Sequence, residues 1–284
     1  MSSAIHSISL LTVRFGESQE TIEKLIQSFL YACRSAGVLS EVIVVDSTTP
    51  NESPLAIDAD FTVINPKSNV MHSKGINLAL LNSTSQFVLI ANPDLIFNPD
   101  SVSYLLSSIS KFGVGLVEGR QVPFDHPKVF NVFTGETSWA SGAFLFGLRS
   151  LILDVGGFDE NNFPMYCNDV DLSWRIRAKG LSIRYEPRAF AHHTKHLDNV
   201  HRVKQSCYES ENILFSSLLL AYKWRSIRYI AMQSAFIRLF GSQKDKIQLS
   251  RFKHQKATLG IDRVCKSDSR TADCRFLNIS KMRF

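Results

Sequence analysis

Two short polar segments follow apolar stretches directly, in places where side chains at the ends of strands could reach a ligand. Asp46 closes EVIVVD, and Asn92-Pro93-Asp94 follows FVLIA. In open α/β sheets, ligands bind outside the carboxyl ends of the strands. Asp46 could accept hydrogen bonds from a ribose or a base, and Asp94 could hold Mg²⁺ or Mn²⁺ against diphosphate oxygens. Each also has a purely structural interpretation, because both segments suit a turn.

A second acidic group lies in YCNDVDLSWRIRAKG, which follows the segment GGFDE. Asp169 and Asp171 are expected to open a helix there, since capping and the helix dipole favour carboxylates at a helix start. A partly desolvated carboxylate is also what a general base for a sugar hydroxyl requires. One of the two is therefore a candidate catalytic base, and the alternative for both is a helix cap.

Histidines cluster in the segment RYEPRAFAHHTKH, where His192 and His193 are adjacent and His196 is close behind. Adjacent residues of an extended chain point to opposite faces, so at most one of the pair can enter a given site. Metal ligation is one interpretation, and ordinary surface histidines are the other.

The elements that must position these residues alternate in the front part of the chain. We expect strands at 5–13, 41–46, 61–64 and 87–91, and helices at 18–35 and 73–81. This order implies a parallel sheet with crossover helices. Farther on the order is irregular, with helices near 99 and at 150–155 and 169–179, and strands at 114–117 and 139–146. The second half is therefore expected to be mixed rather than regular α/β.

Length and composition allow one sizeable core with a smaller appendage, because the chain has 284 residues and is 44% hydrophobic. Its five cysteines show no CxxC spacing, and their odd number argues against a disulfide framework or a cysteine zinc site. We therefore expect a reducing, cytoplasmic location. No GxGxxG or GxxxxGKS loop occurs, which excludes the usual dinucleotide and P-loop signatures.

No signal peptide is predicted, because MSSAIHSISLLTV has no basic leader and alternates like a strand. The longest other apolar run, 213–222, is about half of the ~20 residues that span a bilayer. We therefore expect a chain that does not cross a membrane.

The basic charge is concentrated at the end of the chain. From Val200 onward there are seventeen Lys or Arg and six Asp or Glu, which leaves fifteen and twenty before it. From about Tyr208, apolar and basic residues interleave at mostly helical spacings, and we divide the chain into a catalytic unit at 1–205 and a basic amphipathic helical tail at 206–284. The tail could lie on an anionic membrane surface, pack on the catalytic unit or form a dimer. It has no known nucleic-acid motif, so no nucleic-acid partner is expected.

Seven segments, taken in order, resemble the family-2 inverting glycosyltransferases, nearest to their rhamnosyltransferase-like branch. They are ISLLTVRF, EVIVVDS, NVMHSKGINLAL, FVLIANPDL, WASGAFLFGLRSLILDVGGFDE, YCNDVDLSWRIRAKG and YEPRAFAHH. The resemblance covers about residues 8–196. It implies a GT-A fold, with a Rossmann-like nucleotide-binding half and a mixed-sheet acceptor half, followed here by the helical appendage.

The resemblance also implies roles for particular residues. Asp169 would be the catalytic base, and Asp94 and His193 would hold a divalent cation, Mg²⁺ or Mn²⁺, with the donor diphosphate. The residues implied in nucleotide or donor binding are Asp46, Arg14, Phe15, Lys74, Asn77, Asn92 and Asp94. The residues implied in the sugar or acceptor pocket are Trp139, Gly142 and Asp171.

The chain departs from the family pattern in four places. Arg14-Phe15-Gly16 stands where Thr-Tyr-Asn is usual, and 69–72 reads NVMH where NxGF is usual. Asn92 replaces the first acid of a DxD-like motif, and Asn168 replaces the glutamate before the base.

The function that follows is transfer of a sugar, rhamnose by branch resemblance, from a nucleotide-diphosphate donor with inversion. The expected acceptor is a glycan, in particular a lipid-linked intermediate of a bacterial surface polysaccharide such as an O-antigen. That acceptor would place the protein peripherally on the cytoplasmic face of the inner membrane. The two asparagines leave a non-catalytic module that binds a nucleotide sugar or glycan as the alternative.

Overall fold

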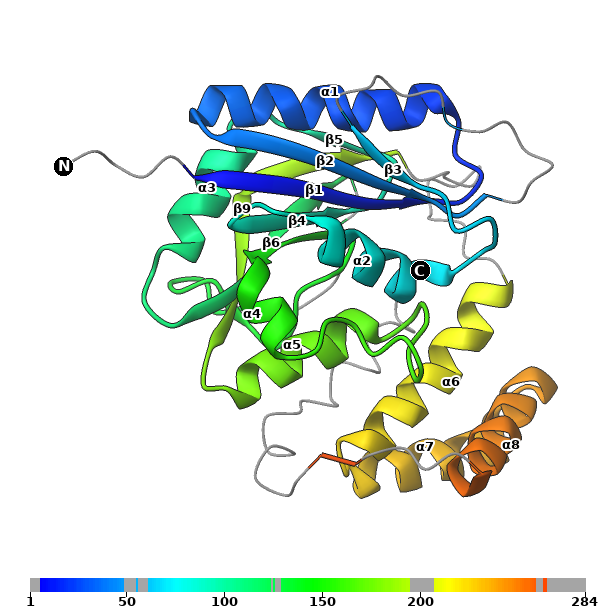
Figure 1. The fold of residues 1–284 in the computed structure, drawn as a ribbon. Coiled ribbons are helices and arrows are strands. Elements are labelled where there is room, and N and C mark those ends of the chain that lie inside the picture. Colours follow the sequence, from blue (N-terminus) through cyan, green and yellow to red (C-terminus); the bar gives the residue numbers. More distant parts are fainter. Residues whose placement is uncertain are drawn as a thin grey trace.

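A computed structural model describes residues 6–48, 55, 61–123, 125, 129–194, 207–258 and 263–264. Figure 1 shows a twisted central sheet covered by helices, with three further helices beside this catalytic unit. The sheet has the strand order β3-β2-β1-β4-β8-β6-β9-β5, and β7 pairs with β9.

The first half of the sheet is parallel, as the sequence predicts. Strands β2 and β4 both pair in parallel with β1, and β3 pairs in parallel with β2. Helix α1 begins after Ser18, whose side chain accepts a hydrogen bond from the N–H of Thr21, and ends at Gly37 in a left-handed conformation. The elements of this half are β1 (Ser7–Arg14), α1 (Gln19–Ala36), β2 (Leu39–Asp46), β3 (Thr62–Ile64), α2 (Met71–Asn82) and β4 (Phe87–Ala91).

The second half is mixed, because β8 runs antiparallel to both β4 and β6. Its elements are β5 (Leu95–Phe97), α3 (Ser101–Ile109), β6 (Val114–Val122), β7 (Glu136–Thr137), β8 (Phe144–Leu148), α4 (Arg149–Asp154), α5 (Asn168–Ala178) and β9 (Ser182–His193). The strand predicted at 139–146 is wrong in its first part. The N–H groups of Ser141 and Gly142 donate to the side chains of Glu118 and Asp169, not to a neighbouring strand.

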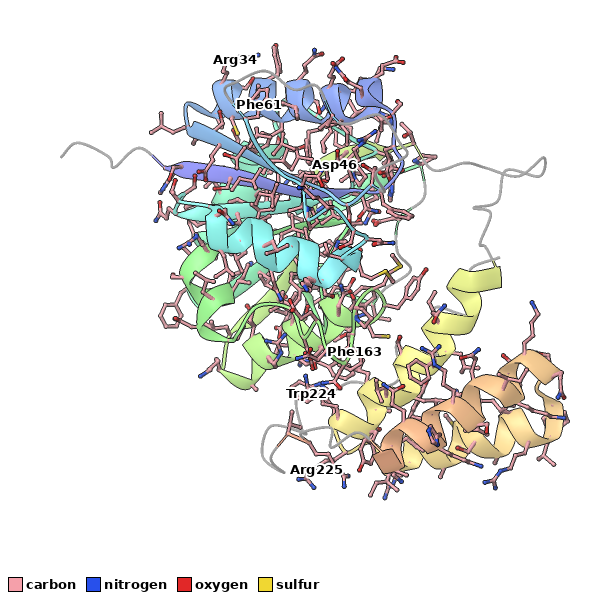
Figure 2. All side chains as sticks on the ribbon, turned by 45° about the vertical axis from the view of Figure 1, so that its right-hand side comes forward. Arg34, Asp46, Phe61, Phe163, Trp224 and Arg225 are labelled. Atoms are coloured by element: carbon pink, nitrogen blue, oxygen red, sulfur yellow. The ribbon has the colours of Figure 1, made fainter. Side chains whose placement is uncertain are left out.

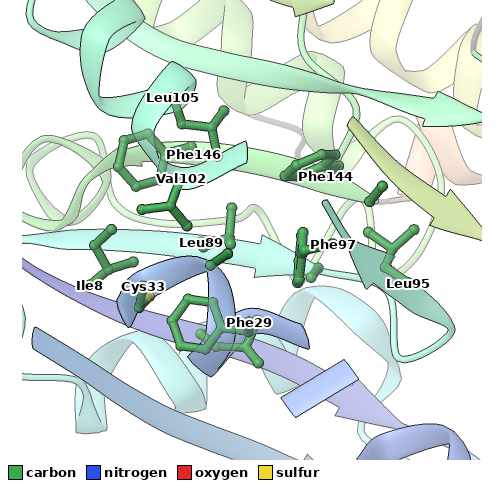
Figure 3. Packing of buried hydrophobic residues seen from close by; sticks show 14 of the residues in the cluster. Ile8, Phe29, Cys33, Leu89, Leu95, Phe97, Val102, Leu105, Phe144 and Phe146 are labelled. Atoms are coloured by element: carbon green, nitrogen blue, oxygen red, sulfur yellow. The ribbon is translucent and has the colours of Figure 1, made fainter. Parts of the chain in front are cut away.

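Apolar side chains fill both faces of the sheet. One cluster lies between the sheet and helices α1 and α3, and Figure 3 shows Phe29, Phe97, Phe144 and Phe146 within it. A second cluster lies under α2, α4 and α5 and includes Ile76, Ile152 and Leu172. The sheet is therefore held rigidly between two layers of helices, and its strand ends have fixed positions.

The C-terminal helices are α6 (Cys207–Lys223), α7 (Ile227–Phe240) and α8 (Gln243–Thr258). Helix α6 is joined to the catalytic unit by a third apolar cluster, in which Phe163 and Trp174 meet Leu218 and Trp224. Figure 2 labels Phe163 and Trp224 at this junction. Among the helices that the structure describes, none is long and apolar enough to cross a membrane. The rest of the predicted tail, apart from 263–264, lies outside the described residues.

Candidate functional site

A cleft of about 850 Å³ opens at the carboxyl ends of β1 and β4. Its lining residues come from five places: the loop after β1 with the first turn of α1, the start of α2 with the residues before it, the NPD segment after β4, the loop before α5, and the end of β9. They are Val13, Phe15, Gly16, Glu17, Ser18, Thr21, Asn69, Met71, His72, Asn92, Pro93, Asp94, Met165, His193 and Thr194. The predicted residues Phe15, Asn92, Asp94 and His193 therefore meet in one cleft.

Asp94 and His193 form a pair at one wall of the cleft. Strand β5, which follows the NPD segment, runs antiparallel to the end of β9 and brings His193 opposite Leu95. His193 Nε2 lies 3.0 Å from Asp94 Oδ1, and His193 Nδ1 lies 2.7 Å from the side-chain oxygen of Gln121. The His193 side chain is buried, whereas that of Asp94 is 26% exposed. Gln121 therefore orients the imidazole, and the carboxylate is left at the surface of the cleft.

Glu17, which the sequence analysis did not select, lies at the same wall. Burial raises the pKa of this carboxyl group above its usual value, and the negative charge of nearby Asp94 raises it further. The N–H of Phe15 donates to Glu17 Oε2 over 2.6 Å, and the ring of Phe15 is half exposed beside it. The cleft thus combines an aromatic ring with two acidic groups, which suits a ligand that carries both a flat ring and hydroxyl groups.

Asp169 comes to the same end of the sheet. The N–H of Asn92 donates to the carbonyl of Ala143. Gly142, the residue before Ala143, donates its N–H to Asp169 Oδ2 over 2.9 Å. The half-buried Asp169 carboxylate also accepts from the N–H of Val170 at the start of α5. These two backbone donors hold the carboxylate in one orientation.

His72, another residue that the prediction of site residues omitted, joins the start of α2 to the start of α5. The side-chain nitrogen of Asn168 lies 3.0 Å from His72 Nδ1 and 2.8 Å from Ser73 Oγ. Burial lowers the pKa of His72 to about 4, so the imidazole is neutral at pH 7. Asn168, which stands where the family has glutamate, therefore meets a neutral histidine.

Arg14 and Asp46 lie opposite each other at the ends of β1 and β2. The guanidinium binds Asp46 Oδ2 over 3.0 Å, and Thr48 donates to the other carboxylate oxygen. Both side chains are almost completely buried, and neither lines the cleft. The pair supports the loop that carries Phe15, because Arg14 Nε also donates to the carbonyl of Glu17.

The structure corrects the prediction that Asp171 lies in the sugar or acceptor pocket. Asp171 is fully buried, and one of its oxygens contacts Lys223 Nζ over 2.8 Å and Trp224 Nε1 over 2.9 Å. Its other oxygen accepts from Arg175 Nε over 2.8 Å. Residues two apart on a helix point about 200° apart, so Asp171 faces α6 and not the cleft.

Three other predicted residues also lie away from the cleft. Asn77 binds the backbone of Phe158 at both its N–H and its carbonyl, and it lines a separate hollow of about 380 Å³. Lys74 is exposed on α2, and Trp139 packs against the third apolar cluster. None of these three predicted residues lines the large cleft. More of its lining residues than predicted come from the loop after β1.

The residues present fit a divalent cation in part. A carboxylate and an imidazole that is oriented from its far side by a second residue are ligands of the kind that Mn²⁺ accepts. Within the described residues, no group of three or more His, Cys, Asp or Glu side chains could hold a metal ion. A cation at Asp94 and His193 would therefore need further ligands from a bound substrate or from water.

Comparisons with known proteins identify the family of the chain. The family model "Glycosyl transferase family 2" matches residues 9–160. A poly-beta-1,6-N-acetyl-D-glucosamine synthase of Staphylococcus aureus is 22% identical over 208 residues, which are 65% of this chain and 49% of that protein. Rhamnosyltransferase WbbL of Escherichia coli K12 is 39% identical over 61 residues, 22% of this chain and 23% of that protein. The chain thus spans about half the length of the first of these curated relatives.

Two solved structures share the fold. A mannosyltransferase from Pyrobaculum calidifontis, in complex with GDP-Man and Mn²⁺, superposes with a TM-score of 0.57 at 14% identity, over 99% of this chain and 87% of that one. GalNAc-T7 with UDP, GalNAc and Mn²⁺ superposes with a TM-score of 0.66 at 10% identity, over 90% of this chain and 57% of that one. The predicted GT-A fold is confirmed by these likenesses.

Proposed function

We propose that this chain, which belongs to glycosyl transferase family 2, transfers a sugar from a nucleotide-diphosphate donor to a glycan hydroxyl with inversion. One observation carries the proposal: Asp94 pairs with His193 in the cleft, and the segment that carries Gly142, whose N–H donates to Asp169, is bound to the NPD segment by the hydrogen bond between Asn92 and Ala143. The cleft lies at the carboxyl ends of β1 and β4, which is where an α/β sheet binds its ligand.

The donor would lie along the cleft. Phe15 offers an exposed ring against which a base can stack, and Glu17 offers a carboxyl group to base or ribose donors. Arg14 and Asp46 act in support, because they bind each other and hold the loop in place. The diphosphate would then extend towards Asp94 and Asn92.

A divalent cation at Asp94 and His193 would offset the charge that grows on the diphosphate as it leaves. Gln121 prepares this position by holding the far nitrogen of the imidazole. The two solved structures with the same fold contain Mn²⁺, which supports Mn²⁺ as the first cation to test.

Asp169 would act as the base. As the acceptor oxygen attacks the anomeric carbon, the bond from that carbon to the diphosphate breaks and the hydroxyl proton passes to the Asp169 carboxylate. The N–H groups of Gly142 and Val170 hold the carboxylate in one orientation before the reaction. Attack from the face opposite the leaving group inverts the anomeric centre.

For the substrates, we propose rhamnose as the sugar and a lipid-linked intermediate of a bacterial surface polysaccharide as the acceptor. The first rests on the 39% identity to the rhamnosyltransferase over 61 residues. For the second, the polysaccharide synthase among the relatives supports a glycan acceptor, and the lipid link rests on the family resemblance and the basic tail. Such an acceptor places the protein in the cytoplasm, at the inner face of the membrane.

The test is a panel of nucleotide sugars, with binding measured by thermal shift and transfer measured with Mn²⁺ and purified glycan acceptors. We expect saturable binding of one donor and a product whose anomeric configuration, read by NMR coupling constants, is opposite to that of the donor. A retained configuration would overturn the inverting mechanism. Binding of a donor without transfer to any acceptor would favour the non-catalytic module, which Asn92 and Asn168 keep as the second candidate.

A further inference from the structure

Helix α7 has an exposed apolar face that no described part of the chain covers. Its buried residues Tyr229, Gln233 and Ile237 face α6 and α8, the helices that it contacts most. The side chains of Met232, Phe236, Leu239 and Phe240 are 52–74% exposed. Their spacing of four, three and one residues places the first three along one side of the helix. Figure 1 shows α7 and α8 beside the catalytic unit, on the far side of α6 from α5.

Positive charges surround this face. Residues 227–258 contain seven Lys or Arg and one acidic residue, Asp245. Arg228 and Arg238 are exposed on α7 itself, and Lys246 and Lys253 are exposed on α8. Asp245 balances only one of these seven charges, which leaves a clear excess of positive charge.

We propose that the exposed face of α7 docks on an anionic lipid surface. Apolar side chains flanked by cations, on a helix whose other side is held by protein, are what insertion into the interface of a negatively charged membrane requires. The acyl region would take up Phe236 and Leu239, and the lipid phosphates would pair with Arg228 and Arg238. No sugar transfer is involved, so this inference goes beyond the proposed function and stands apart from it.

A second copy of the chain is a poorer occupant. In a two-fold dimer the same patch would meet itself, so the excess of positive charge on one copy would face the same excess on the other. An anionic lipid surface offers the opposite charge together with an apolar layer. It can therefore bind both the apolar side chains of the face and the cations near them.

The consequence for the catalytic unit follows from the packing of α6. This helix contacts α7 and α8 on one side and shares the third apolar cluster with Trp174 of α5 on the other. Helix α5 begins beside Asp169. Docking through α7 would therefore fix the position of the catalytic unit relative to the membrane.

The experiment is flotation of the full chain with phosphatidylcholine vesicles, with and without phosphatidylglycerol. We expect at least about tenfold more binding to the anionic vesicles, and loss of most of it when both Phe236 and Leu239 are changed to Ser. Phe112→Ser is the matched control, since this phenylalanine is fully exposed on the catalytic unit. It should bind as wild type does.

A second pair of variants tests the charge. Arg228→Gln with Arg238→Gln should lower anionic binding several-fold, whereas Lys179→Gln, an exposed lysine just after α5, should not. Failure of the wild type to bind anionic vesicles, or equal binding by the Phe236→Ser/Leu239→Ser variant, would overturn the proposal. So would a dimer in light scattering that this double variant converts to a monomer, or salt-sensitive RNA binding in place of vesicle binding.

Discussion

Asp169 and Asp171 are separated by one residue, yet their surroundings are opposite. Asp169 is half buried near the cleft, and the backbone N–H groups of Gly142 and Val170 donate to it. Asp171 has no exposed surface and binds Lys223, Trp224 and Arg175. The first arrangement leaves a carboxylate that a substrate can reach, and the second uses a carboxylate to fasten a distant helix. The two residues show that neighbouring carboxylates on one helix can have different roles. The role depends on whether nearby backbone groups or the side chains of another helix bind the carboxylate.

Lys223 is shared within the closed cluster. Its ammonium group binds Asp159 over 2.7 Å and Asp171 over 2.8 Å, and its side chain is only 10% exposed. Burial by itself would raise the pKa of Asp159, but the bonds from Lys223 and Asn162 outweigh it and hold the pKa below its usual value. One loop and two helices, α5 and α6, therefore depend on one cation.

The largest effect is expected from Lys223→Met, which leaves two buried carboxylates without their shared cation. The free energy of unfolding should fall by about 3 kcal/mol, measured by urea denaturation at pH 7. Lys179→Met, at an exposed lysine, is the control and should change it by less than about 0.5 kcal/mol.

The same variant has a signature in pH. Because the folded pKa of Asp159 lies below the unfolded value of about 3.9, its contribution is present above that pH and lost as the pH falls through the folded pKa. The gap between Lys223→Met and wild type should therefore narrow below about pH 4. A gap that is constant from pH 7 to pH 3 would contradict the ionic origin of the effect.

The second prediction concerns the open carboxylate. Asp169→Asn should lower the rate of transfer at least about 100-fold, because the acceptor proton loses its base. Donor affinity and the urea midpoint should stay close to wild type, since Asn can still accept the N–H bond of Gly142. Retention of more than about a tenth of wild-type turnover would remove Asp169 from this role.

The third prediction concerns the pair at the opposite wall. Asp94→Ala and His193→Ala should each weaken Mn²⁺-dependent donor binding by about 10- to 100-fold, measured by calorimetry with and without EDTA. Wild-type transfer that is unaffected by EDTA would exclude a required cation and leave Asp94 as a direct contact to the donor.

The smallest effect at neutral pH is expected from His72→Gln. With a folded pKa of about 4 and an unfolded pKa of about 6.5, wild-type His72 takes up its proton more readily in the unfolded state. Wild-type stability should therefore fall as the pH drops from about 6.5 to 4, and the variant should show a flatter profile over that interval. Identical profiles would show that burial does not lower the pKa of His72 in the folded protein.

Much of the fold could be predicted, because continuous apolar strands such as 41–46 and 87–91 alternate with helices of clear periodicity. Strand β9, which lies between β6 and β5 in the sheet, was missed as an element, since Pro187 and its charged neighbours do not form an alternating pattern. Of the site residues, Asp94 and His193 lie 3.0 Å apart, as neighbours that the resemblance implies, and their role in holding a cation stays a prediction.

The misses have a common physical cause. The assignment of Asp171 to the pocket overlooked its partner Lys223. That lysine is 52 positions away, and no local pattern in the sequence indicates such a pair. His72 and Glu17, which both line the cleft, were not predicted as site residues. His72 lies in a segment that departs from the family pattern, and Glu17 directly follows another such segment. Departures from the family pattern were therefore the signal in the sequence that could have identified these two residues.

The ion pairs of Lys223 also determine where the chain can be shortened. A boundary at 205/206, as predicted from composition, would remove the cation and the indole that satisfy Asp171 and would expose the apolar surface around Phe163. Any minimal version made for crystallisation or engineering therefore has to continue at least through Trp224, and α7 and α8 also contribute Tyr229, Ile237, Leu249 and Phe252 to the same apolar cluster.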